Sequence, residues 1–236
     1  MALTGTAFLA LFNGFDPARD DEYNRWHSGE HVPERLTVPG ITSSRRYVGR
    51  DEALYTYFTL YEMASPDTML SQPYLDLMKH PTPWTAAMRS GFRNFYRVPC
   101  ATLASVGDGV GGALKIFVLS GNVGDDKAVA SADWLALAAA LTATTGCVAA
   151  HIGLEDTRLP GPPGLGAASA EPVPTVAVLV EAQEARALHE RSEQLSTLLR
   201  QGAPSWHVAG SHEYVLMHLL NEQPPKPVEQ QKRPAA

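Results

Sequence analysis

The stretch from residue 41 to residue 63, ITSSRRYVGRDEALYTYFTLYEM, decides how the first half of the chain folds. Residues 41–48 and 54–63 are rich in β-branched and aromatic side chains, and a turn-like segment at 49–51 separates them. This pattern predicts two consecutive strands joined by a short turn. Two strands with no helix between them favour antiparallel pairing in one sheet.

The flanking segments extend this pair of strands into a six-element unit. Residues 7–15 form an apolar, strand-like run, and a segment of helical composition follows it and breaks at Pro33 or at Pro39-Gly40. After the strand pair, Ser65-Pro66-Asp67 predicts the start of a helical stretch that runs to about Gly91. Residues 92–104 return as a strand. The order is β-α-β-β-α-β, which is the ferredoxin-like unit.

The same order recurs after a glycine-rich boundary at 107–112. Strands are expected at 114–120, 147–154, 175–181 and 211–220, helices at 130–145 and 184–201, and a Pro- and Gly-rich loop at 160–174. The predicted fold class is therefore α+β, with tandem ferredoxin-like repeats. We expect a first unit over residues 1–106 that carries the functional site, a second unit over 113–220 that acts mainly as scaffold, and a mobile tail over 221–236.

Each predicted unit is a four-stranded antiparallel sheet with helices on one face only, so the other face of each sheet needs a cover. Packing the two sheets face to face within one chain supplies this cover and forms an intrachain α/β barrel. The alternative is that each half packs against another chain in a larger oligomer. The short linker and the repeated element order favour the intrachain barrel, and pairing into a homodimer stays open.

Composition narrows the classes of partner. The 236 residues carry 19 Lys and Arg against 25 Asp and Glu, a formal net charge of −6, and the body of the chain holds no densely basic stretch. This balance disfavours nucleic acid and anionic membranes as partners. We find no basic leader and no apolar run long enough to cross a bilayer, so we expect a cytoplasmic protein with a small-molecule substrate.

The densest group of reactive side chains lies between residues 23 and 35, YNRWHSGEHVPER. The longer run WHSGEHVPERLTVPGITSSRRY resembles the first helix and second strand of the dimeric α/β-barrel (ferredoxin-like) superfamily, in particular its EthD-like group. In that group a Trp and an acid-His-x-Pro element precede a Pro-Gly turn and a strand with basic and aromatic residues. The resemblance covers roughly residues 7–104, and the second half resembles the superfamily only in element order.

The resemblance implies a cleft between the sheet and the helices of the first unit. Members of the superfamily use this cleft for small hydrophobic or aromatic molecules, and they include lactone isomerases, polyketide cyclases and dehydratases, cofactor-free monooxygenases and haem enzymes. Because one fold hosts all of these activities, the choice among them rests on the site residues.

His31 is the leading candidate for a catalytic residue. It matches the family's acid-His-x-Pro element, and an imidazole can act as both base and acid near neutral pH. His27 lies one helical turn earlier, whereas the adjacent Glu30 points about 100° away. The alternative is that His31 only caps the end of the helix. H-x-x-E-H also matches an inverted zinc-protease signature, but Gly29 and Pro33 disfavour a rigid zinc helix, so we expect no metal.

Further candidates surround this helix. Arg45 and Tyr47 share one face of a strand, where they could stabilise an oxyanion, although a rim salt bridge would also explain Arg45. His80, within the motif HPTPW, is a secondary catalytic candidate. The residues expected to contact an aromatic substrate are Trp26, Tyr57 and Trp84. Tyr57 belongs to a row of side chains on one face of its predicted strand, formed by Tyr55, Tyr57, Thr59 and Tyr61. Packing alone would also account for this row and for HPTPW.

These observations lead to a cofactor-independent enzyme of the isomerase or lyase class that acts on a small hydrophobic or aromatic metabolite by histidine-mediated proton transfer. His31 would remove the proton, with His27 or His80 assisting and Arg45 or Tyr47 holding the oxyanion. Two alternatives stay open. One is a non-catalytic module that binds an aromatic metabolite, and the other is a haem- or metal-dependent enzyme with His27, His31 or His80 as ligand.

Overall fold

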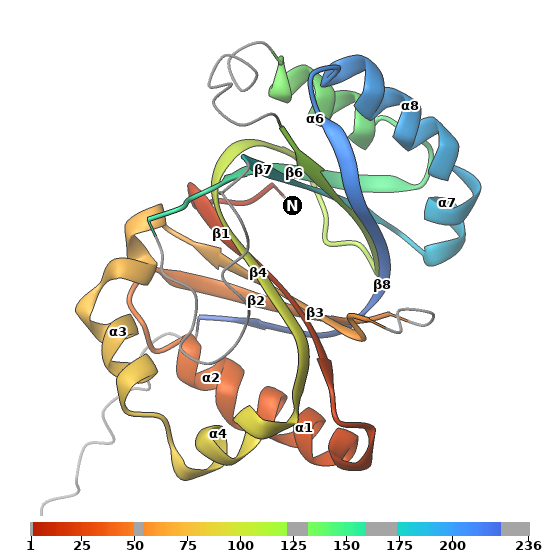
Figure 1. The fold of residues 1–236 in the computed structure, drawn as a ribbon. Helices are drawn as coiled ribbons and strands as arrows, with labels where there is room; N and C mark the ends of the chain where they lie inside the picture. The colour runs from red at the N-terminus through yellow and green to blue at the C-terminus, as the bar shows by residue number, and fades with distance from the viewer. Residues whose placement is uncertain (1, 50–53, 122–131, 159–173, 223–236) are drawn as a thin grey trace, which may run out of the picture.

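The computed structural model describes residues 2–49, 54–121, 132–158 and 174–222. Its eight strands form one closed barrel in the order β1-β3-β2-β8-β5-β7-β6-β4, and every neighbouring pair is antiparallel (Figure 1). The order β4-β1-β3-β2 in the first half and β6-β7-β5-β8 in the second is that of two ferredoxin-like sheets. The predicted fold class is thereby confirmed.

The first half follows the predicted order with short irregular helices. Its strands are β1 (Ala7–Phe15), β2 (Ile41–Val48), β3 (Tyr57–Met63) and β4 (Phe92–Gly107). Its helices are α1 (Asp20–Trp26), a π-helix (His27–His31), α2 (Val32–Arg35), α3 (Gln72–Lys79) and α4 (Pro83–Met88), with 3-10 turns at Pro17–Arg19, Pro66–Leu70 and Arg89–Gly91.

The second half repeats the arrangement. Its strands are β5 (Ala113–Ser120), β6 (Cys147–Glu155), β7 (Thr175–Ala182) and β8 (His207–Asn221), and its helices are α6 (Trp134–Thr142), α7 (Ala185–Glu190) and α8 (Ser192–Gly202). α6 ends at Thr142, three residues before the predicted end, and Gly146 adopts φ +86°, a conformation that favours glycine, in the turn that leads into β6. The loop predicted at 160–174 lies outside the described residues except for Pro174, and so does the predicted tail beyond residue 222.

Two long strands close the barrel by passing from one sheet to the other. The first part of β4 pairs with β1, and its last residues, from Cys100 to Gly107, pair with β6. In the same way β8 pairs first with β5 and then, from Val215 to Asn221, with β2. The two halves therefore cover each other within one chain.

The barrel interior is mainly apolar and draws on both sheets. Phe8, Phe12 and Phe58 of the first half pack there with Ile116 and Leu179 of the second. Burial of this surface is the main driving force for joining the halves.

One ionic group lies among these interior side chains. The Arg45 guanidinium donates to Glu181, whose carboxylate also contacts His151 Nε2 at 2.9 Å and accepts from the Gly111 backbone N–H at 2.6 Å. The partners come from β2, β6 and β7, so this group links the two sheets. Removing one partner would leave a buried charge uncompensated, which typically costs about 3–5 kcal/mol.

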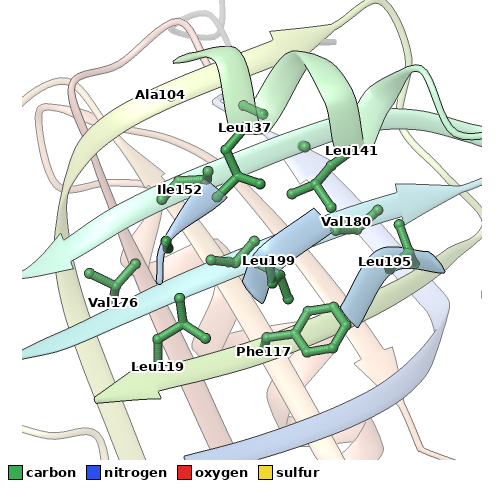
Figure 2. Close-up of a cluster of buried hydrophobic side chains, with 14 of the residues drawn as sticks. Ala104, Phe117, Leu119, Leu137, Leu141, Ile152, Val176, Val180, Leu195 and Leu199 are labelled. Carbon is green, nitrogen blue, oxygen red and sulfur yellow. The ribbon is translucent and has the colours of Figure 1, made fainter. Parts of the chain in front are cut away.

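The helices cover the outside of the barrel in two separate layers, with α1–α4 against the first sheet and α6–α8 against the second (Figure 1). In the second layer, buried apolar side chains fill the space between the helices and the sheet. Leu137 and Leu141 of α6 and Leu195 and Leu199 of α8 contact the outer face of β5, β6 and β7 (Figure 2). None of the helices among the described residues is long and apolar enough to cross a membrane.

Candidate active site

A cavity of about 90 Å³ lies between the outer face of the first sheet and the helices that cover it. Its floor comes from β1, β2, β3 and β4, and its walls come from the π-helix, α2, α3 and the segment around α4. The cavity reaches the surface, because Arg89 at its wall is exposed. The lining residues are Leu9, Leu11, Trp26, His27, His31, Arg35, Ile41, Tyr61, Met63, Met69, Tyr74, Met78, Thr85, Arg89, Phe92, Phe95 and Arg97.

The size and the walls of this cavity limit its ligand. An apolar cavity of roughly 150 Å³ is known to accept one benzene molecule, so 90 Å³ suits one small ring rather than several fused rings. Met63, Met69 and Met78 line the wall, and flexible methionine side chains can adjust to a ligand somewhat larger than the empty space.

The π-helix determines how the two cavity histidines lie. Pro33 has no N–H, and in an α-helix its ring would clash with the carbonyl group of Gly29, four residues earlier. Over His27–His31 the helix takes the wider π form, in which an N–H bonds to the carbonyl five residues earlier instead of four. The Val32 N–H accordingly bonds to the His27 carbonyl. A turn of this kind is often found at functional sites. The chain then continues through Pro33 to Arg35, so the helix does not break at this proline.

His27 and His31 lie side by side in the cavity wall. Their ring centroids are 5.3 Å apart, and the His31 ring packs on Trp26 at 4.6 Å. The Nδ1 atoms of both rings are buried and have no hydrogen-bond partner. Both rings line the cavity, and each keeps one ring nitrogen without a hydrogen-bond partner.

Both histidines are held in the neutral form. Burial lowers the pKa of His27 well below 6.5, and the positive charges of Arg46 and Arg35 and the nearby His31 and His218 lower it further. Burial also lowers the pKa of His31, helped by Arg35 and Arg46. At neutral pH both imidazoles are therefore in the form that can accept a proton.

The glutamates beside His31 do not orient it. Glu30 turns away and accepts hydrogen bonds from Thr82 Oγ1 at 2.6 Å and Thr85 Oγ1 at 3.4 Å, which ties the π-helix to α4. Glu34 lies 3.7 Å from Arg35 Nη2, and its Oε2 has no hydrogen-bond partner. The position of His31 therefore depends on the π-turn and on its packing against Trp26.

Arg46, not Arg45, points from β2 toward the helices. Its guanidinium donates to Ser28 Oγ at 3.0 Å and to Asn24 Oδ1 at 2.6 Å, and it lies over the rings of Tyr23 and Tyr57 at 4.9 and 5.0 Å. These partners are all neutral, and Arg46 Nε has none. Arg46 thus places a positive charge behind His27.

His218 reaches this group from the second half of the chain. Residue 218 pairs with Arg46 across the junction between β8 and β2, and its side chain lies near enough to His27 to lower the pKa of that residue. Its Nδ1 is buried without a hydrogen-bond partner. The second half is therefore more than a remote support for the cavity.

The structure separates several of the predicted site residues from the cavity. Arg45 and Tyr47 share a face, as expected, but this face is the barrel interior, where Arg45 binds Glu181. They lie across the sheet from His31, because neighbouring residues in a strand point to opposite faces. The arrangement in which they hold an oxyanion next to His31 is therefore corrected.

The other predicted contacts divide in the same way. Trp26 lines the cavity, and its indole N–H donates to Thr85 Oγ1 at 3.2 Å. The Tyr57 hydroxyl donates to Asp20 at 2.6 Å, outside the cavity lining. His80 is exposed at the end of α3. Trp84 donates to Glu22 at 3.3 Å and does not line the cavity.

The sequence analysis did not name several lining residues as candidates. Arg35 could have been found, because it lies four residues after His31 on the same helical segment. His218 and Arg97 carry no comparable local signal, since they reach the site only through strand pairing.

The haem alternative does not fit this site. A porphyrin has four pyrrole rings in one plane, whereas the cavity between His27, His31 and the sheet measures about 90 Å³, which suits one small ring. The third candidate ligand, His80, is exposed and outside the cavity. Over the described ranges no group of three or more His, Cys, Asp or Glu side chains could hold a metal ion.

Comparison with solved structures supports the barrel fold. An anthrone oxidase-like protein superimposes with a TM-score of 0.64 at 14% identity, over 94% of this chain and 96% of that one. A candidate monooxygenase of Fusobacterium nucleatum gives 0.54 at 11% identity, over 93% and 96%. A chlorite dismutase variant from Candidatus Nitrospira defluvii gives 0.52 at 10% identity, over 91% and 92%.

These likenesses show a shared fold and no more at such identities. No protein-family model matches the chain, and no curated protein resembles it. The predicted membership of the dimeric α/β-barrel superfamily is supported as far as the fold, and the assignment to its EthD-like group stays a prediction.

Proposed function

We propose that this protein is a cofactor-independent enzyme that removes an acidic C–H or O–H proton from a small, mainly apolar ring compound. His31 accepts the proton on its imidazole ring, His27 lies beside it, and Arg35 stabilises the negative charge that develops on a substrate oxygen atom. This retains the predicted histidine base and replaces Arg45 and Tyr47 with Arg35 as the oxyanion partner.

The observation that carries this proposal is the pair of neutral, buried imidazoles with unpartnered Nδ1 atoms in one cavity wall. A base must be unprotonated before it can act, and burial beside two arginines keeps these rings unprotonated. The same lowered pKa makes each ring a weaker base. The substrate must therefore be acidic already, as at a carbon atom next to a carbonyl group and a double bond.

The carbanion formed in this step has two chemically reasonable fates. Reprotonation at another carbon gives isomerisation, which agrees with the sequence-based expectation of an isomerase or lyase. Transfer of electrons to dioxygen gives an oxidised product, and the names of the anthrone oxidase-like and monooxygenase-like structures favour this second fate. Both fates begin with the same proton abstraction.

The first test follows proton exchange, because it needs no net conversion. Unsaturated five-membered lactones and cyclohexenones are incubated with protein in D₂O, and deuterium uptake next to the carbonyl group is followed by NMR. We expect His31→Gln to lower the catalysed rate by about 10²–10⁴-fold, the usual contribution of a general base. His189→Gln, at an exposed histidine of α7, is the matched control and should not change the rate.

The other outcomes separate the alternatives. Equal exchange by wild type and His31→Gln would refute the assignment of His31 as the base. Saturable binding of these compounds without exchange would instead support a non-catalytic binding module. Oxygen consumption under air, measured with an electrode, distinguishes oxidation from isomerisation.

A further inference from the structure

The cavity is electropositive although the chain as a whole is acidic. Arg35, Arg89 and Arg97 line it together with two histidines, and no Asp or Glu occurs among its lining residues in the described part of the chain. The protein carries a formal net charge of −6. A concentration of positive charge in a cleft with apolar walls attracts anions and raises their local concentration.

Arg35 is the most deeply placed of these lining arginines. Arg35 is only 6% exposed, and its Nη1 atom is buried with no hydrogen-bond partner. The nearest carboxylate, Glu34, lies 3.7 Å from Nη2, beyond hydrogen-bond distance. Burial raises the pKa of Glu34, and the charge of Arg35 opposes this shift. Arg35 therefore lines the cavity and keeps an unused donor.

Arg46 increases the imbalance of charge behind the cavity wall. It is 1% exposed, and its hydrogen bonds go only to neutral side chains. An uncompensated buried charge is costly, and a nearby anion removes much of that cost. Asp20 lies one hydrogen bond further away, since it accepts from Asn24 Nδ2 at 3.0 Å and from the Tyr57 hydroxyl at 2.6 Å. Two buried guanidiniums without a direct hydrogen bond to a carboxylate in the described part of the chain therefore favour an anionic ligand over a neutral one.

Tyr61 supplies a second donor on the cavity floor. Its hydroxyl is buried and has no hydrogen-bond partner, and burial raises the pKa of Tyr61, so the group stays protonated. A protonated hydroxyl close to the charge of Arg35 can donate to the same oxygen atoms.

We infer that the natural ligand of this cavity is a small carboxylate with an apolar body. Its carboxylate accepts from Arg35 Nη1 and from the Tyr61 hydroxyl, and its body packs against the methionine and aromatic walls. A planar carboxylate matches the guanidinium fork. A dianionic phosphate would leave more acceptors unpaired among these apolar walls. The inference deepens the proposed function, since it adds a charge to the substrate.

The probe for this inference is benzoate, with benzamide as its neutral partner of nearly the same shape. Binding is measured by isothermal titration at low ionic strength and again at 1 M NaCl. We expect benzoate to bind wild type at least tenfold more tightly than benzamide at low ionic strength, and salt to weaken the binding of benzoate only. Equal affinities for the two probes, or no binding of benzoate, would overturn the inference without the need for any variant.

Two variants then locate the anion. Arg35→Gln should weaken benzoate binding at least tenfold and leave benzamide within twofold, and Tyr61→Phe should weaken benzoate binding a few-fold. Arg200→Gln, on the exposed face of α8, is the matched control and should change neither. If Arg35→Gln folds and keeps the preference for benzoate, Arg35 is not the anchor. Benzoate has no acidic C–H, so these results do not depend on whether His31 is a base.

Discussion

The two sheets have the same topology, but the spaces between their outer faces and the covering helices differ. One space is filled by apolar side chains, and the other holds a cavity. In the second half, leucines of α6 and α8 meet valines of β7 (Figure 2). Trp134 packs edge-on against Trp206, with ring centroids 5.9 Å apart. In the first half, the corresponding space holds a cavity with two histidines and three arginines in its walls.

Buried polar atoms without partners follow the same division. In the described part of the chain, all of them except His218 Nδ1 belong to residues before 107, and His218 lies where β8 joins the first sheet. Such atoms lower stability, so they persist where the rest of the fold supplies enough stability to tolerate them. The second half of the molecule therefore supplies stability, while the first half keeps a site with unpaired polar atoms.

The largest difference is expected from truncating leucines on the two faces. Leu195→Ala in the second half should lower the free energy of unfolding by about 2–5 kcal/mol, because it opens a void in a filled core. Leu11→Ala at the cavity wall should cost only about 1–2 kcal/mol, since its surroundings are already incompletely packed. Urea unfolding of both variants measures the two free energies of unfolding. Equal decreases would contradict the inference that the two halves are packed differently.

Enlarging a side chain should also separate the halves. Ala138→Leu in α6 overfills a core with no spare volume and should cost about 1–3 kcal/mol. Leu11→Phe should change stability by less than about 1 kcal/mol, because the ring can enter the cavity, and it should prevent benzoate binding. Thermal unfolding and titration test the pair. Benzoate binding retained in Leu11→Phe would show that the ligand lies elsewhere.

Acid should destabilise the first half through its histidines. The unfolded chain binds protons at these residues below about pH 6.5, whereas folded His27 and His31 resist protonation. The free energy of unfolding should therefore fall as the pH drops below 6.5, by up to about 1.4 kcal/mol per pH unit for each histidine, and be insensitive to them above it. The double variant His27→Gln/His31→Gln should flatten this slope, and His189→Gln should not.

The smallest effect on stability concerns the π-turn. Pro33→Ala removes the cause of the widened turn, so the segment can relax toward an α-helix and rotate His31 relative to His27. We expect stability to change by less than about 1 kcal/mol and deuterium exchange to slow about tenfold. Gly29→Ala is the control, because an added Cβ there meets nothing within 4 Å and Pro33 is kept. Unchanged exchange in Pro33→Ala would show that the turn does not position His31.

The order of elements and the intrachain barrel could be predicted from sequence because they depend on local signals. Alternating β-branched and aromatic residues at 41–48, turn residues around 49–51 and the Gly107–Gly112 boundary are all readable along the chain. The interruption of the first helical stretch at residues 80–83 is readable from its prolines, and α3 does end there. A single helix was expected at 184–201, and it is divided at Arg191, where the backbone leaves the α-helical conformation. Local propensity does not show such a break when both flanks favour a helix.

Which face of β2 looks toward the helices could not be predicted. Alternation separates Arg45 from Arg46, but β3 has Phe58 and Leu60 on one face and Tyr57 and Tyr61 on the other, so both faces read as apolar. Without a polar face to mark the outside, the sequence does not distinguish barrel interior from cavity. Tyr55 shows the same limit: it precedes β3, and its ring packs near Phe12 in the barrel rather than with Tyr57.

The junction between β8 and β2 has a consequence for how the protein is made. β8 is the last strand in the sequence, and it pairs with β2 of the first sheet. During synthesis β2 therefore remains an unpaired edge strand until nearly all of the described chain has been made. Contacts between such distant segments form slowly, and an exposed strand edge can pair with other chains meanwhile. His218 joins His27 and Arg46 only at that last step, so the site reaches its final form at the end of folding.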